Sequence, residues 1–299
     1  MPCVHKSRDR LHVCKMFCPY LGTLSCRSPP DGSRCAITKS RLPVNCNTPA
    51  SLTRHFAYAA LVSLSDLVYN FDCHNELDTG QAGRGDVTMS IDHETIDRIV
   101  SIEWEMFTAV NEGKARASCQ EDQQTFEVMR ISQFGAWSTG AAASYLDDLE
   151  AALAVGRNLV EEKYINMMKT TRPEEYNALL SRLTLPTEKA RALAQELNDM
   201  LVKQTRALFE DYPYVSGRSR PLYSEFDNYG TSVETYQLGE LLTYSEKTLA
   251  ALKAHVLSLA GSGKTYAKTV LENTVRFYGY ESLDDAEAVA RNHYGYGEG

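Results

Sequence analysis

Three polar residues fall on the apolar faces of two neighbouring stretches with helical periodicity. When the stretch 90–110 is wound at about 100° per residue, Glu103 lies in the middle of its apolar face. On the next stretch, 120–137, Arg130 and Gln133 occupy the equivalent place. A buried carboxylate needs a partner to stay ionised, and an arginine cannot lose its charge. We therefore expect Glu103 and Arg130 to pair between two helices, with Gln133 completing the hydrogen bonds.

A buried pair of this kind has two uses, which the sequence leaves open. It can fix how two helices pack without adding stability, or it can line a pocket for a small polar or anionic ligand. In an enzyme, Glu103 or Glu127 would be the general base and arginines would hold the substrate. Three functions therefore stand: a helical ligand-binding or accessory protein with a polar pocket, an enzyme acting on a small anionic or peptide-like substrate, and a helical protein-interaction module.

Cys119 is a third candidate for chemistry because it directly precedes the helix predicted over 120–137. The positive end of a helix dipole makes a thiol more reactive. A nucleophile also needs a base, and from Met89 onward the only histidines are His93, His255 and His293. The alternative is a small buried cysteine without chemistry.

Two arginines, Arg218 and Arg220, flank Ser219 in the stretch 212–231, which is rich in Pro, Gly and Asn. Guanidinium groups on an acidic chain suit a carboxylate or phosphate ligand. They suit the chain's own carboxylates equally well. We expect this stretch to form one long irregular loop, the kind of connection that often carries function.

Several familiar motifs are absent or incomplete. The run 258–265 resembles the end of a phosphate-binding loop, but Ser258 replaces the first glycine and a helical pattern precedes the run where a strand is required. It therefore predicts a turn between helices. The sequence contains no Glu-x-x-His, H-E-x-x-H or G-x-S-x-G motif. We expect no metal and no cofactor.

The overall composition excludes some partners. A net charge of −8 and a pI near 5.5 argue against binding to nucleic acid or to an anionic membrane, which depends on clustered basic residues. The longest apolar run, 56–71, is interrupted by polar residues and falls short of the roughly 20 apolar residues that a membrane span needs. We expect a cytoplasmic protein with no membrane contact; the sequence indicates no particular protein partner.

The first 88 residues differ in kind from the rest. They hold seven of the eight cysteines and carry 10 basic and 7 acidic side chains, net +3, against 21 and 32, net −11, in 89–299. We interpret 1–88 as a Cys-rich extension that is disordered or wrongly included upstream of a start near Met89. The alternatives are a loosely packed helical extension through 57–71 and a metal site at Cys14 and Cys18, which lack a second knuckle.

Residues 89–299 predict a single all-α domain of about eight or nine helices. Gly156 has the place of a left-handed helix terminator. The predicted helices cover 90–110, 120–137, 141–155, 159–169, 173–183, 187–210, 232–259, 266–278 and 283–291.

Short motifs along this helical part resemble a known bacterial family. They are Arg116–Gln120, Phe126–Arg130, Ser132–Phe134 with Trp137, Asn158–Leu159, Glu162–Tyr164, Met167–Met168, Gly217–Pro221, Ser232–Tyr236, Gly239–Glu240 and Thr243–Ser245. The family is catalogued as domain of unknown function 4125, and the resemblance covers about 91–283. It implies an all-helical single domain and no established activity, cofactor or catalytic residue. The matched residues that could share a ligand site are Arg130, Gln133, Lys163, Tyr164, Arg218, Arg220, Glu234 and Tyr236.

Overall fold

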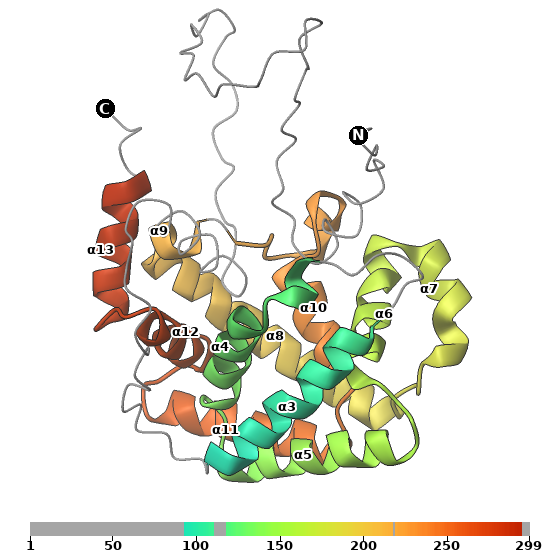
Figure 1. The fold of residues 1–299 in the computed structure, drawn as a ribbon. Coiled ribbons are helices and arrows are strands. Elements are labelled where there is room, and N and C mark those ends of the chain that lie inside the picture. The colour runs from blue at the N-terminus through green and yellow to red at the C-terminus, as the bar shows by residue number, and fades with distance from the viewer. Residues whose placement is uncertain (1–92, 111–117, 218, 295–299) are drawn as a thin grey trace, which may run out of the picture.

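A computed structural model describes residues 93–110, 118–217 and 219–294 (Figure 1). Within these ranges the chain forms eleven α-helices, three 3-10 helices and no strand. The predicted all-α single domain is therefore confirmed, with two or three more α-helices than the eight or nine expected. The predictions for residues 1–88 and for Arg218 lie outside the described residues.

Local sequence signals set where most of these helices begin. Seven helices start after a Ser, Thr, Asp or Asn whose side chain accepts a hydrogen bond from the backbone N–H three residues on, which satisfies an N–H that has no partner within the helix. The α-helices are α3 (His93–Ala109), α4 (Gln123–Phe134), α5 (Thr139–Ala154), α6 (Leu159–Thr171), α7 (Pro173–Leu179), α8 (Glu188–Asp211), α9 (Pro213–Ser216), α10 (Val233–Leu241), α11 (Glu246–Gly261), α12 (Tyr266–Phe277) and α13 (Leu283–Tyr294). The 3-10 helices are η1 (Ser118–Glu121), η2 (Leu180–Arg182) and η3 (Ser224–Tyr229).

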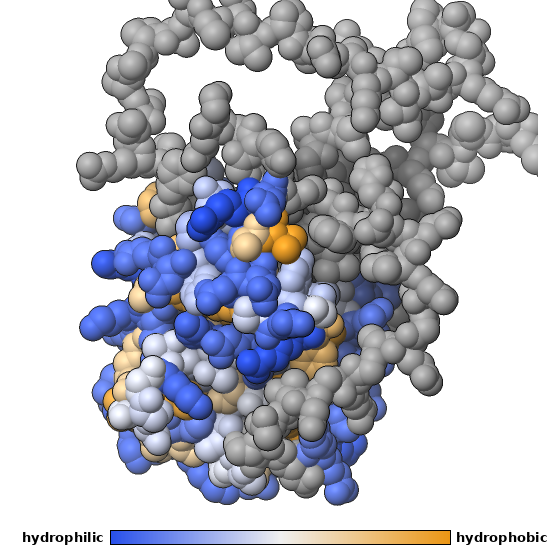
Figure 2. All heavy atoms as spheres, turned by 90° about the vertical axis from the view of Figure 1, so that its left-hand side faces the viewer, coloured by the Kyte–Doolittle hydropathy of each residue, from blue (hydrophilic) through white to orange (hydrophobic). Residues whose placement is uncertain are grey.

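Two helices organise the packing. The longest, α8, contacts α9, α10, α11 and α12, while α3 contacts α4, α5 and α6 (Figure 1). Both contribute to one apolar core, in which Ile99, Phe134, Trp137, Leu197 and Leu252 are almost wholly buried. The face that carries α13 is mainly hydrophilic, with hydrophobic residues in small patches (Figure 2).

Helices α6 and α10 approach each other closely at a glycine. A Cβ atom on Gly239 would lie 2.8 Å from Cγ of Met167 and 3.0 Å from the carbonyl oxygen of Lys163. Cβ atoms essentially never lie within 3.0 Å of a non-bonded heavy atom, so a residue other than glycine would force the Met167 side chain or the backbone of α6 to shift. This contact brings the next residue, Glu240, against the side chain of Lys163.

The helix predicted over 232–259 is two helices, α10 and α11, separated at 242–245. Ser245 caps α11. Its backbone N–H donates to the carboxylate of Asp148 at 2.9 Å, and the Thr248 hydroxyl donates to the same oxygen at 2.7 Å. The prediction of a continuous helix was wrong because these polar contacts, partly from a distant helix, stabilise a break that periodicity does not reveal.

The stretch 212–231 is only partly irregular, since it contains α9 and η3. The backbone N–H groups of Tyr214 and Val215 donate to the carboxylate of Glu287 at 3.1 and 2.8 Å, so a side chain of α13 caps α9.

Two predicted turns are confirmed. Gly156 follows α5 with a φ of 72°, and Gly263, with a φ of 75°, lies in the turn between α11 and α12. In the part of the chain that is described, no helix has the length and apolar character to cross a membrane.

Candidate functional site

The predicted pair between Glu103 of α3 and Arg130 of α4 is confirmed. Arg130 donates from Nε to Oε2 of Glu103 at 2.6 Å and from Nη2 to Oε1 at 2.5 Å. Only 10% of the Arg130 side chain and 2% of the Glu103 side chain are exposed. Two parallel hydrogen bonds between a guanidinium and a carboxylate are among the strongest that side chains form. The pair therefore fixes the register of the first two described helices.

Arg130 also faces a second carboxylate, that of Glu240 on α10. Gln133 joins the two residues, because it accepts from Nη1 of Arg130 at 2.7 Å and donates to Oε1 of Glu240 at 2.7 Å. Nη1 and Nη2 of Arg130 lie 3.3 and 3.2 Å from Oε2 and Oε1 of Glu240. The predicted role of Gln133 in completing the hydrogen bonds is confirmed, and one guanidinium serves two buried carboxylates.

A second cation balances the charges. Lys163 of α6 donates from Nζ to Oε2 of Glu240 at 2.5 Å, so two buried cations face two buried carboxylates. Two tyrosines add donors: Tyr145 bonds Glu103 Oε1 at 2.7 Å and Tyr244 bonds Glu240 Oε1 at 2.6 Å. We call these seven residues the charge cluster: Glu103, Arg130, Gln133, Tyr145, Lys163, Glu240 and Tyr244.

The electrostatics of the charge cluster favour the ionised forms of Glu240 and Arg130. Burial alone would raise the pKa of Glu240, but the charges of Arg130 and Lys163 outweigh burial and hold this pKa well below its ordinary value. Burial alone would lower the pKa of Arg130, and the carboxylates of Glu103 and Glu240 raise it instead. The charges of Glu240 and Arg130 are thus each stabilised by opposite charges beside them.

The two tyrosines of the cluster stay protonated. Burial, followed by the negative charge of Glu103, raises the pKa of Tyr145 well above its ordinary value. Burial and the charge of Glu240 raise the pKa of Tyr244 in the same way. Both hydroxyls therefore act as fixed hydrogen-bond donors to carboxylates.

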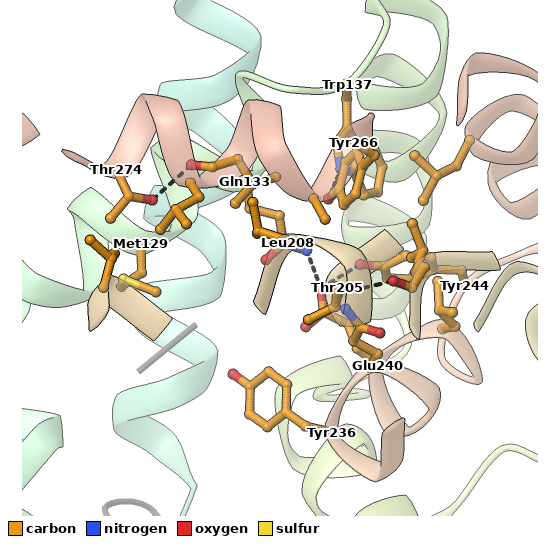
Figure 3. Close-up of a pocket in the computed structure, with 18 residues that line it drawn as sticks. Met129, Gln133, Trp137, Thr205, Leu208, Tyr236, Glu240, Tyr244, Tyr266 and Thr274 are labelled. Atoms are coloured by element: carbon orange, nitrogen blue, oxygen red, sulfur yellow. Dashed lines mark hydrogen bonds between the residues drawn. The ribbon is translucent and has the colours of Figure 1, made fainter. Parts of the chain in front are cut away.

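A cavity lies beside the charge cluster, and residues of α4, α8, α9, α10, α11 and α12 line it (Figure 3). Its solvent-accessible volume is about 60 Å³, and most of its lining is apolar. Gln133, Glu240 and Tyr244 of the cluster form part of its wall. Trp137 and Tyr266 form another part, where the indole N–H of Trp137 donates to the Tyr266 hydroxyl at 2.9 Å. Three of the seven cluster residues are thus part of the cavity wall.

The other residues predicted to share a ligand site lie beside the cluster or outside it. The ring of Tyr236 lines the cavity and lies under two cations, with Lys163 Nζ 3.8 Å and Arg220 Cζ 4.7 Å from its centroid. Tyr164 packs near this ring, and burial raises its pKa well above the ordinary value. Glu234 accepts from the backbone N–H of Ser224 at 2.7 Å, a contact that orders the start of η3.

The three candidate catalytic residues, Glu103, Glu127 and Cys119, are absent from the described lining of the cavity. Glu103 and Glu127 are not among the described residues that line it, and Glu127 accepts a hydrogen bond from Gln123 at 2.8 Å. Cys119 lies in η1, whereas α4 begins at Gln123 and is capped by Asp122. The expectation that Cys119 directly precedes a helix was wrong, because the 3-10 turn and the cap separate it from the dipole of α4.

Sequence reasoning missed Glu240, Tyr145 and Tyr244 as site residues. Counting charges could have revealed the need for a second carboxylate. If Arg130 and Lys163 are both buried, two carboxylates are needed to balance them, and Glu103 supplies only one. No group of three or more His, Cys, Asp or Glu side chains within the described ranges is placed to hold a metal ion.

Comparison with known proteins gives a family and no activity. The family model described as "Protein of unknown function (DUF4125)" matches residues 93–288, which include the whole charge cluster and the cavity lining. The chain has no significant match among curated proteins or among solved structures. The match spans well over half of the chain, as the resemblance in the sequence implied, and the chain therefore belongs to the DUF4125 family of proteins of unknown function.

Proposed function

We propose that this protein binds a small molecule in the cavity beside the charge cluster. The cavity itself carries the proposal. Ligand sites in proteins are typically concave and mostly apolar, with a few polar groups in the wall. A partly open pocket of about 60 Å³ with a mostly apolar lining, next to a fully paired set of buried charges, has this character.

Glu240, the carboxylate on the cavity wall, supports binding rather than general base catalysis. A general base needs a free lone pair and a pKa near the working pH. The pKa of Glu240 is held far below that range by Arg130 and Lys163, and hydrogen bonds from four side chains occupy both of its oxygens. The donors are Arg130, Gln133, Lys163 and Tyr244.

The cluster is suited to hold the cavity wall in a fixed shape. It ties together α3, α4, α6 and α10 through Glu103, Arg130, Lys163 and Glu240. A site that is rigid before binding loses less conformational entropy when its ligand arrives. We include a bacterial, cytoplasmic location in the proposal, as composition and the family resemblance lead us to expect.

The two tryptophans of the chain allow a direct test. Trp137 lines the cavity, whereas Trp104 on α3 packs against Phe107 and Phe126. We would label the protein with 5-fluorotryptophan, assign the two ¹⁹F signals with the Trp104→Phe variant, and titrate with benzene, a neutral apolar probe. A saturable shift of the Trp137 signal with a constant Trp104 signal is expected. A titration in which neither signal saturates, or in which both shift alike, would refute the proposal.

A matched pair of variants checks that the shift comes from the cavity. Ala267 on α12 lines it, and Ala254 on α11 is exposed elsewhere. Ala267→Leu should fill part of the cavity and weaken the benzene response, while Ala254→Leu should leave it unchanged. Equal responses in the two variants would place the bound benzene somewhere else.

A further inference from the structure

We infer that the cavity selects an uncharged, largely apolar ligand and rejects anions and cations of the same shape. The inference rests on the proposed function and adds the chemical class of the ligand. It follows from the charges in the cavity wall, from the balance of charge behind the wall, and from the hydrogen bonds that already occupy the carboxylate in the wall. An uncharged ligand thereby takes the place of the anionic one that the sequence led us to expect.

The cavity wall is almost free of charge. Glu240 is the only charged residue among the described residues that line it, and most of the lining is apolar. Burial raises the pKa of Tyr244 and of Tyr266 in the same wall, so both phenols stay uncharged at neutral pH. An ion that moves from water into such a surrounding loses its hydration and needs an opposite charge in return. The wall therefore favours a ligand that has no charge to desolvate.

The cations behind the wall are committed to carboxylates, which disfavours an anionic ligand. Arg130 and Lys163 are not among the described residues of the lining, and they balance Glu103 and Glu240 one for one. A turn of either cation toward a bound anion would leave a buried carboxylate without its partner, which is costly. Arg220, whose Cζ lies 4.7 Å from the centroid of the Tyr236 ring, is likewise absent from the described lining.

The carboxylate of Glu240 is not available to a cationic ligand either. Its Oε1 accepts from Gln133 at 2.7 Å and from Tyr244 at 2.6 Å, and its Oε2 accepts from Lys163 at 2.5 Å. Nη2 and Nη1 of Arg130 lie 3.2 and 3.3 Å from these two oxygens. A cation would have to compete with two buried cations for one carboxylate. The aromatic faces of the wall would attract it, but by less than the loss of its hydration costs.

The aromatic side chains of the wall make small single-ring compounds suitable probes. Trp137, Tyr244 and Tyr266 line the cavity, and aromatic rings pack well against one another. Two of the three rings are held in place by the hydrogen bond from the Trp137 indole N–H to the Tyr266 hydroxyl (Figure 3). The hydroxyl of Tyr244 is held by Glu240. A benzene ring with one small substituent therefore allows the charge of the ligand to be changed while the ring stays the same.

Two pairs of probes with matched shapes isolate the effect of charge at pH 7. Benzamide and benzoate have the same size, and only benzoate is an anion. Benzyl alcohol and benzylammonium also have the same size, and only benzylammonium is a cation. With the ¹⁹F signal of Trp137 as the readout and the ionic strength held constant, the uncharged member of each pair should bind at least about tenfold more tightly, because it keeps no charge to desolvate.

A change in the balance of charge tests why anions are rejected. Glu240→Gln keeps the shape of the side chain and leaves Arg130 and Lys163 with one carboxylate, Glu103, so the region behind the wall gains a net positive charge. The preference for benzamide over benzoate should then fall by at least about fivefold, the effect of one uncompensated charge at close range. Glu150→Gln removes an exposed carboxylate and should leave the preference unchanged. The same preference in both variants would contradict the role of charge balance.

The outcomes separate this inference from the proposed function. Equal or tighter binding of benzoate or benzylammonium to the unaltered protein would overturn the inference, while saturable benzene binding would still support the cavity as a site. Benzene binding without binding of benzamide or benzyl alcohol would also overturn it, because the inference requires the uncharged probes to bind. Failure of all four probes and of benzene would reject both. The comparison of probes on the unaltered protein does not depend on the folding of any variant.

Discussion

Arg130 and Glu240, 110 residues apart in the sequence, are joined by a buried ion pair in which Nη2 lies 3.2 Å from Oε1. Arg130 already binds Glu103 through two hydrogen bonds. Removal of this one side chain would therefore leave two buried carboxylates and a single buried cation, Lys163, which pairs with Glu240. Arg130 is thus the member of the charge cluster that bonds both of its carboxylates.

Arg130→Met is therefore expected to lower the free energy of unfolding by about 3–5 kcal/mol, the usual cost of leaving a buried charge without its partner. Urea denaturation would measure it. The control is Arg98→Met on α3, because Arg98 lies 3.9 Å from Glu150 and both side chains are about half exposed. An exposed pair contributes at most about 1 kcal/mol. Losses of similar size in the two variants would show that Arg130 is not buried among carboxylates.

The stability of the protein should fall in acid because of Glu240. Burial would raise its pKa, but Arg130 and Lys163 hold it well below the ordinary value in the folded state. Unfolding restores a pKa of about 4.3, so the unfolded chain binds the proton first as the pH falls. The contribution of Glu240 is present above about pH 5 and is lost as the pH drops toward the folded pKa.

The check is the free energy of unfolding measured by urea denaturation between about pH 7 and pH 3. Glu240→Gln should have a smaller pH dependence than the unaltered protein, although it is less stable at neutral pH. Glu150→Gln, which changes an exposed carboxylate, is the control for loss of one acidic group. An identical pH dependence in all three proteins would contradict the assigned role of Glu240.

Two buried tyrosines should make the protein sensitive to alkali. Burial and the nearby carboxylates raise the pKa of Tyr145 and of Tyr244 well above the ordinary value of about 10. As the pH rises above about 10, the unfolded chain loses these protons first, and the folded state loses stability. Tyr145→Phe and Tyr244→Phe should each reduce this loss, whereas Tyr229→Phe, at an exposed position, should not. Urea denaturation near pH 10 would measure the free energy of unfolding of each variant. An equal loss of stability with rising pH in all three variants would contradict the role of the two buried tyrosines.

Gly239 should tolerate no side chain, because α6 and α10 touch there. Gly239→Ala places a Cβ atom 2.8 Å from Met167 and 3.0 Å from the backbone of Lys163, which we expect to cost about 1–3 kcal/mol of stability. Gly140→Ala on α5 meets no atom within 4 Å and should be neutral or stabilising by up to about 1 kcal/mol. Thermal unfolding of the two variants is a direct comparison, and a harmless Gly239→Ala would mean that the helices are farther apart.

The fold was predictable where the signals are local. Helix starts follow from capping residues such as Ser138 and Thr187, and the pair of Glu103 and Arg130 follows from helix phase alone. The break between α10 and α11 was not predictable from periodicity. It depends on Asp148, a residue about 100 positions earlier in the sequence, which bonds Ser245 and Thr248.

The site was predictable only in part, for the same reason. Gln133 is one turn of helix from Arg130, so a single helical wheel relates them. Glu240 reaches the cluster through the packing of α10 on α6 at Gly239, and no local pattern encodes that approach. The cavity is a property of six helices together, because its wall takes residues from α4, α8, α9, α10, α11 and α12.

The most direct test of ligand binding is a crystal structure of the protein grown with bromobenzene, whose bromine is located by anomalous scattering. We expect a bromine signal inside the cavity, beside Trp137 and Tyr266, with the charge cluster unchanged. A structure in which side chains such as Leu208 and Leu271 close the space, or in which bromine is found only outside it, would contradict the proposal that this cavity is a binding site.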